Sequence, residues 1–346
     1  MFKTTLTLLL LLLIKMNTYG QKDITIGKTY TINSEILQED RTIQIYLPKS
    51  YTDTNYSLQH YPVIYLLDGE SNFNYLTAFV EKLSRNPYPS IPEMIIIGIV
   101  NTNRTRDLTP TTPNENSLSA EQKNKTKGET GGNSRFFEFI DKELMPFINE
   151  QYRTKGYNVL IGHSFGGITA LNNLLNHTTM FQAYIVHDPS IWWDNQYILK
   201  TYKQAINKDF KHRKLFITQV DESLNKDINK PHYTGIKDFH RLMQNEQLHN
   251  LAYKYIEYQG EDHGSIPMKG NLDGLRYIFD GYKINLKDIK NNLTLVEDTY
   301  KSFSKKIHFE FLPSEAYLDF IINYYKQINN QEVVDYYEQY KRSLYN

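Results

Sequence analysis

One stretch decides the fold and the chemistry expected of this chain: Leu160-Ile161-Gly162-His163-Ser164-Phe165-Gly166-Gly167. It begins in an apolar run typical of a strand and precedes a helix predicted over residues 168–174. A serine in the pattern G-x-S-x-G at such a junction sits on a strained turn, so its hydroxyl projects from the sheet. The amide of Phe165 would then start a helix, where partial positive charge stabilises an oxyanion. We predict that Ser164 is a nucleophile; the alternative is a glycine-rich turn with an incidental serine.

Segments typical of strands and helices alternate on both sides of this turn. Continuous apolar runs are typical of strands buried on both faces of a parallel sheet. The predicted strands are 43–47, 62–67, 94–100, 158–161, 182–187, 215–220 and 252–258, and the predicted helices include 136–148, 236–248 and 273–282. This alternation predicts an α/β fold, a central, mostly parallel sheet with helices on both faces.

The two ends of the chain have a different character. Lys3, the apolar run 6–14 and the small residues before Gln21 predict a signal peptide over residues 1–20 and an exported, periplasmic or secreted protein. The alternative is an uncleaved anchor, but the run is short for a stable membrane span. Residues 21–285 are predicted to form the α/β domain. Strand patterns stop near Leu286, so residues 286–346 are predicted to form a short C-terminal helical extension.

Composition excludes several classes of partner and cofactor. Lys plus Arg and Asp plus Glu both number 39, so the formal net charge is zero and neither nucleic acid nor an anionic membrane is an expected partner. The absence of cysteine excludes disulfides, thiolate metal sites and a cysteine nucleophile. The histidines lack the H-E-x-x-H spacing of a zinc site, so no metal and no cofactor is predicted.

A serine nucleophile needs a base, which in turn needs an acid to orient it. His263 follows the last predicted core strand and is the predicted base, whereas His232 is expected to be a solvated or packed imidazole. The acid should follow strand 215–220, where Asp221 and Glu222 stand together. Glu222 is slightly favoured, because a turn usually takes a residue or two before the acid. The alternative is that both are solvated loop carboxylates.

The sequence also offers candidates for the oxyanion site and for substrate binding. The Asp68-Gly69 turn predicts that the amide of Glu70 is a second oxyanion donor beside that of Phe165, although it also fits an ordinary turn. Four side chains are substrate-binding candidates: Arg104, Arg106, Trp192 and Trp193. Arginine forks suit carboxylate or catecholate oxygens, and the tryptophans could stack on a sugar or aryl ring. The alternatives are surface pairing with Asp107 for the arginines and core packing for the tryptophans.

Five blocks stand in an order that resembles the esterase D-like family of α/β-hydrolases. They are Tyr61 to Gly69, Arg104 to Thr111, Gly162 to Gly167, Asp188 to Asn195 and Gly260 to Ser265. The resemblance covers about residues 25–285 and is nearest the exported branch that resembles siderophore esterases. It implies the α/β-hydrolase fold, Ser164 and His263 as the catalytic pair, and Glu70 and Phe165 as amide donors. The acid position departs from the family pattern, which leaves Asp221 and Glu222 both open.

The resemblance implies hydrolysis of a carboxylic ester by a Ser-His-acid triad. A small-molecule or carbohydrate-linked ester is the expected substrate, with siderophore esters among the candidates. Two other functions are compatible with the sequence. One is an acyltransferase on the same scaffold, and the other is a non-catalytic binding protein whose C-terminal extension carries the interaction. Such extensions resemble tetratricopeptide units in some relatives, while a helix pair that caps the domain is an equally good interpretation here. The sequence does not indicate an oligomeric state.

Overall fold

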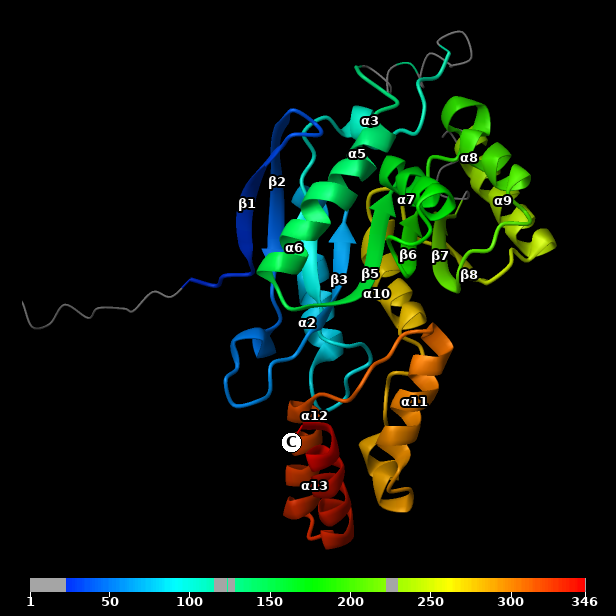
Figure 1. The fold of residues 1–346 in the computed structure, drawn as a ribbon. Helices are drawn as coiled ribbons and strands as arrows, with labels where there is room; N and C mark the ends of the chain where they lie inside the picture. The colour runs from blue at the N-terminus through cyan, green and yellow to red at the C-terminus, as the bar shows by residue number, and fades with distance from the viewer. Residues whose placement is uncertain (1–22, 115–122, 124–127, 222–229, 346) are drawn as a thin grey trace, which may run out of the picture.

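A computed structural model describes residues 23–114, 123, 128–221 and 230–345. Its central feature is an eight-stranded sheet in the order β1-β2-β4-β3-β5-β6-β7-β8 (Figure 1). β2 pairs antiparallel with both β1 and β4, and all other neighbours are parallel. The strands are β1 (Lys28–Ser34), β2 (Glu39–Tyr46), β3 (Tyr61–Leu66), β4 (Ile95–Ile99), β5 (Thr154–His163), β6 (Ala183–His187), β7 (Arg213–Val220) and β8 (Leu251–Tyr258). The predicted mostly parallel sheet is confirmed.

Helices cover both faces of the sheet. One face packs against α5 (Asn133–Phe139), the π-helical turn η3 (Ile140–Leu144), α6 (Met145–Gln151), α7 (Phe165–Asn176), α8 (Trp193–Gln204) and α9 (Lys230–Glu246). The other packs against α2 (Gly69–Ser84) and α10 (Ile266–Ile278). Two short helices, η1 (Lys49–Thr52) and α3 (Arg104–Asp107), lie in connections.

Successive residues of a strand point to opposite faces of the sheet, so they pack into two separate cores. In β3, Val63 and Tyr65 belong to the core under α5 to α9, whereas Ile64 and Leu66 belong to the core under α2 and α10. All four are at most 1% exposed. Burial on both faces explains why the interior strands are continuous apolar runs in the sequence. β1 was not predicted, because it is a largely exposed edge strand without such a run.

The C-terminal residues form η5 (Leu286–Asn291), α11 (Leu295–Ile307), α12 (Glu315–Gln327) and α13 (Gln331–Tyr345). These helices share one apolar core with the α2 and α10 face of the sheet. In that core, the ring of Tyr157 in β5 lies 5.3 Å from Phe309 and 5.6 Å from Phe311. The helices therefore cap the end of the sheet opposite the carboxyl ends of its parallel strands (Figure 1).

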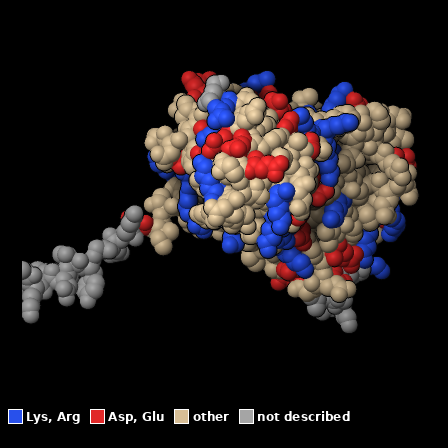
Figure 2. Space-filling view, turned by 90° about the horizontal axis from the view of Figure 1, so that it is seen from below, with Lys and Arg blue, Asp and Glu red and all other residues tan. Residues whose placement is uncertain are grey.

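The surface of this end has no single sign of charge. Figure 2 shows basic and acidic side chains interspersed over the face seen from below. Every helix in the described part of the chain is too short or too polar to cross a lipid bilayer. The predicted signal peptide, residues 1–20, lies outside the described residues.

Candidate active site

Ser164 occupies a strained turn between β5 and α7. Its backbone has a φ of 58° and a ψ of −112°, a conformation that a residue with a Cβ rarely adopts. The Ser164 amide donates to the carbonyl of His187 at 2.9 Å, which ties the turn to the end of β6. A Cβ on Gly162 would lie 2.1 Å from the carbonyl oxygen of Gly166, so this glycine is required for the close approach. Strain of this kind indicates a functional position.

The loop after β6 lies directly against this turn. The amide of Ser190 donates to the carbonyl of Ser164 at 3.1 Å, and the two serine hydroxyls are 3.2 Å apart. A Cβ on Gly167 would lie 2.9 Å from the Cβ of Pro189. The segment from Asp188 to Ser190 is thus held beside the serine hydroxyl.

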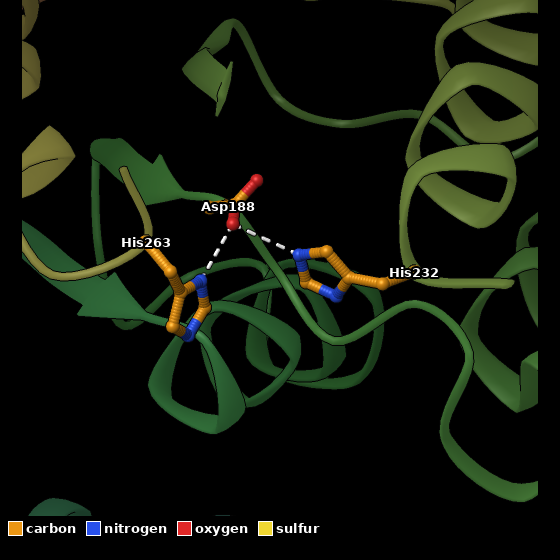
Figure 3. A group of neighbouring side chains, drawn as sticks. All are labelled: Asp188, His232 and His263. Atoms are coloured by element: carbon orange, nitrogen blue, oxygen red, sulfur yellow. Dashed lines mark hydrogen bonds and ion pairs between the residues drawn. The ribbon is translucent and has the colours of Figure 1, made fainter. Parts of the chain in front are cut away.

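His263 is paired with a buried carboxylate, that of Asp188 (Figure 3). His263 lies between β8 and α10, and its Nδ1 is 2.6 Å from Oδ2 of Asp188. The Asp188 side chain is fully buried, whereas that of His263 is 49% exposed. The His263 ring lies 4.4 Å from that of His163, the residue before Ser164. A carboxylate on Nδ1 fixes the tautomer that leaves Nε2 free to accept a proton.

The carboxylate on His263 comes from a different strand than the sequence predicted. We expected Asp221 or Glu222, after β7, but Asp188 follows β6. The Asp221 amide donates to the carbonyl of Tyr258 at 3.0 Å, and Glu222 lies outside the described residues. β6 and β7 are parallel neighbours, so their carboxyl ends meet at one edge and either could supply an acid. Asp188 and the pair Asp221-Glu222 all stand between Ser164 and His263 in the chain, so the order serine, acid, histidine does not distinguish the two strand ends.

Asp188 is held ionised by its hydrogen bonds. Burial raises the pKa of a carboxyl group, but hydrogen bonds from His232 and His263 outweigh it and hold the pKa of Asp188 below its usual 3.8. The backbone of Asp188 is also fixed: its φ is 40°, and its amide donates to the carbonyl of Thr218 at 2.8 Å. The site therefore contains a charged carboxylate that is buried and hydrogen-bonded.

His232 is a second residue of the site, besides Asp188, that was not predicted from the sequence. It belongs to the first turn of α9, is 10% exposed, and places Nε2 at 2.9 Å from Oδ2 of Asp188. No spacing in the sequence indicated this contact. Asp188, His232 and His263 bring their ligand atoms within 4.8 Å of one another, the kind of group that binds a metal ion. In the structure, the same atoms satisfy each other by hydrogen bonds.

Two other histidines near Ser164 are held neutral. Burial lowers the pKa of His187 to about 4, and its ring nitrogens pair with Thr218 Oγ1 at 3.0 Å and Asn271 Oδ1 at 2.8 Å. Burial also lowers the pKa of His163 well below its usual value. These surroundings favour His263 over either residue as the base.

The predicted oxyanion donors both stand at helix N-termini. Phe165 opens α7, and Glu70 lies in the first turn of α2, after Asp68 with a φ of 54°. The first amides of a helix have no acceptor within that helix and so are available to a ligand. The Glu70 carboxylate is engaged by Asn101, whose Nδ2 donates to Oε1 at 2.6 Å. That contact leaves the Glu70 backbone amide as the group relevant to the site.

Arg104 joins the two turns that carry these amides. Its Nε and Nη2 donate to the Asp68 carboxylate at 2.6 and 3.0 Å, and Nη2 also reaches the carbonyl of His163 at 3.3 Å. Its guanidinium carbon lies 5.6 Å from the centre of the Phe165 ring. The side chain is 36% exposed. These bonds give Arg104 a bracing role that the sequence did not predict.

The side chains of the other predicted substrate contacts have partners within the protein. Arg106 makes two bonds to Glu39, at 2.6 and 3.0 Å, and one to Asp107 at 2.7 Å. Trp192 and Trp193 are 6% and 1% exposed and pack on the ring of Phe165. A partly exposed guanidinium network and a core aromatic cluster satisfy these side chains, so a structural role is favoured over substrate contact.

A strained serine between strand and helix, with an aspartate-bound histidine at the same sheet edge, defines a serine hydrolase of the α/β-hydrolase type. The chain belongs to the family described as "Putative esterase", whose model matches residues 34–262. It is accordingly a serine carboxylic ester hydrolase.

The chain is similar to known esterases in sequence and in structure. It is 30% identical over 243 residues to ferri-bacillibactin esterase BesA of Bacillus subtilis, which is 66% of this chain and 81% of that relative. It is 31% identical over 156 residues to a siderophore enterobactin esterase of Emericella nidulans, 42% of this chain and 51% of that protein. Among solved structures, an IroE-like serine hydrolase from Shewanella oneidensis matches with a TM-score of 0.82 and 34% identity, over 92% of this chain and 99% of its own.

Proposed function

We propose that this chain hydrolyses its ester with a catalytic triad of Ser164, His263 and Asp188. The observation that carries the proposal is the 2.6 Å hydrogen bond between His263 Nδ1 and the buried Asp188, beside a serine on a strained turn. Ser164 attacks the ester carbonyl while His263 Nε2 takes its proton and then gives it to the leaving alkoxide. Water, deprotonated by His263, then releases the acyl group and restores Ser164.

In this proposal, the backbone amides of Phe165 and Glu70 donate hydrogen bonds to the negatively charged oxygen of the tetrahedral intermediate. Both amides begin helices, so the helix dipoles add to the two hydrogen bonds. Asp188 stays ionised through the neutral range because its pKa is lowered, and it therefore stabilises the imidazolium form of His263 in both steps.

We further propose that the ester belongs to an iron-chelating siderophore and that the protein is exported. Relatives named for ferri-bacillibactin and enterobactin esterase activity support the substrate class. The basic start and the apolar run of residues 1–20 support export. Mature protein recovered from cells should then begin at Gln21.

A panel of esters tests the substrate. We expect kcat/KM for ferri-bacillibactin to exceed that for p-nitrophenyl acetate and a feruloyl ester by at least about tenfold, which is about 1.4 kcal/mol of additional transition-state binding. Iron-free bacillibactin is the matched control for recognition of the metal complex. Equal kcat/KM for all esters, or a clear preference for the feruloyl ester, would contradict the siderophore assignment.

A further inference from the structure

Two imidazoles from different elements converge on one buried oxygen. Oδ2 of Asp188 accepts from His263 at 2.6 Å and from His232 at 2.9 Å (Figure 3). Oδ1 has a much weaker contact, the amide of Val220 at 3.3 Å. Asp188 is fully buried, and a buried carboxylate is costly unless strong donors surround it. His232 therefore provides one of the two short hydrogen bonds that hold the charge in place.

The two histidines occupy different positions relative to the reaction. His263 is half-exposed, lies against the residue before Ser164, and exchanges protons in the proposed mechanism. His232 is 10% exposed and approaches Asp188 from α9. The rings are 5.4 Å apart and nearly perpendicular, at 84°, so they reach the carboxylate from separate directions. His232 is a donor that takes no part in proton transfer.

We propose that His232 is a positioning residue of the active site: it fixes Oδ2 of Asp188 in the place from which that oxygen orients His263. This inference rests on the proposed triad. Without the His232 bond, the carboxylate can turn about its Cβ–Cγ bond, and the His263 ring loses the orientation that its 2.6 Å bond to Oδ2 imposes. The expected loss is therefore in the chemical step and not in the binding of substrate.

The surroundings of Asp188 offer no substitute donor of comparable strength among the described residues. The titratable groups that interact with it are His232 from α9, His263 from the β8–α10 loop, His163, His187 and Tyr255. His163 and His187 have lowered pKa values because they are buried, and they stay neutral. Loss of the His232 bond lets burial raise the pKa of Asp188, so the carboxylate would be protonated at a higher pH.

Two substitutions of His232 separate positioning from packing. A glutamine side chain would extend an amide N–H to about the place of the imidazole Nε2, whereas leucine fills a similar volume without a donor. For His232→Leu we expect kcat to fall about 10- to 100-fold with KM nearly unchanged. The kcat of His232→Gln should stay within about threefold of the wild type.

The result that overturns the proposal is equal loss in both variants, or a loss in His232→Leu that lies in KM and leaves kcat unchanged. Thermal unfolding of each variant shows whether the chain is folded. In an Asp188→Asn background, His232→Leu should cost nothing further, because the carboxylate that it positions is gone; an additive loss would also contradict the proposal. Ser164→Ala, measured in parallel with His232 intact, reports separately on the proposed nucleophile.

Discussion

Ser164 and Asp188 share an unusual backbone at the ends of neighbouring parallel strands. Their φ values are 58° and 40°, a region that residues with a Cβ seldom occupy. In each case the chain turns sharply as it leaves the sheet, and both turns are held by backbone bonds to the adjacent strand, to His187 and to Thr218. This strain places a hydroxyl and a carboxylate beyond the same sheet edge, where the loop after β8 brings His263.

The first prediction concerns the choice of acid. Asp188→Asn keeps the shape of the side chain but removes the charge that fixes the His263 tautomer, so kcat should fall by about 10³- to 10⁴-fold. Glu222→Gln is the matched control and should stay within about threefold of the wild type. Steady-state hydrolysis of p-nitrophenyl acetate measures both. A loss in Glu222→Gln as large as that in Asp188→Asn would return the role of acid to the residue first predicted.

For individual residues, the sequence was most informative where the chemistry is local. The strained turn at Ser164 follows from the spacing of its glycines between a strand and a helix, and the structure has that turn. The partner of His263 depends on which of two parallel strands supplies the acid, a choice that no local pattern encodes. His232 depends on how α9 packs over the sheet edge, so its contact could not be predicted from spacing.

Among the helices and strands, the short helix α3 connects the two turns of the proposed oxyanion site. Arg104, at its start, binds Asp68 before α2 and the carbonyl of His163 before α7. Arg106, two residues on, instead binds Glu39 of β2. The same helix thus carries one arginine that links the turns at Asp68 and His163 and one that binds strand β2.

The second prediction concerns Arg104, with Arg106 as its control. Arg104→Gln should lower kcat about tenfold, because the Asp68 turn that carries the Glu70 amide loses a two-point hydrogen bond. Arg106→Gln should lower the melting temperature and leave kcat within about twofold. Kinetics and thermal unfolding of the two variants check this. If both arginines affect kcat equally, or if neither does, Arg104 does not position the oxyanion donors.

Helices and strands could be predicted where burial on one or both faces produces a periodic or continuous apolar pattern in the sequence. The role of a side chain could not be predicted where it depends on a contact between distant segments. Interior strands such as β3 are apolar throughout because both faces are covered. Trp192 and Trp193 look the same in sequence whether they line a substrate cleft or pack in a core. The ring of Phe165, the residue after the nucleophile, is what they contact. That contact arises from the way the loop after β6 folds over α7.

Across the molecule as a whole, the C-terminal helices are packed into the hydrolase core. The shared apolar cluster runs from β5 through α10 to α13. The Shewanella oneidensis structure matches 92% of this chain, a share that has to include residues beyond 285. A cap that completes the core explains this arrangement without a separate partner-binding role.

A third prediction tests that packing with two adjacent residues. Phe311 is 4% exposed and contacts Tyr157, Phe279 and Phe303, whereas Leu312 is 46% exposed. Phe311→Ala should lower the free energy of unfolding by about 3–5 kcal/mol, and Leu312→Ala by less than about 1 kcal/mol. Urea unfolding of the two variants provides the comparison. Equal, small effects would mean that the C-terminal helices contribute little to the stability of the domain.

The most direct test of the proposed mechanism is the site at which the protein reacts with a fluorophosphonate, read by mass spectrometry of the intact chain and of its peptides. We expect one adduct per chain, on Ser164, abolished by Ser164→Ala together with esterase activity. Ser190, whose hydroxyl is 3.2 Å from that of Ser164, is the natural control, and Ser190→Ala should still be labelled. An adduct on Ser190, or undiminished labelling and hydrolysis in Ser164→Ala, would contradict the assignment of Ser164 as the nucleophile.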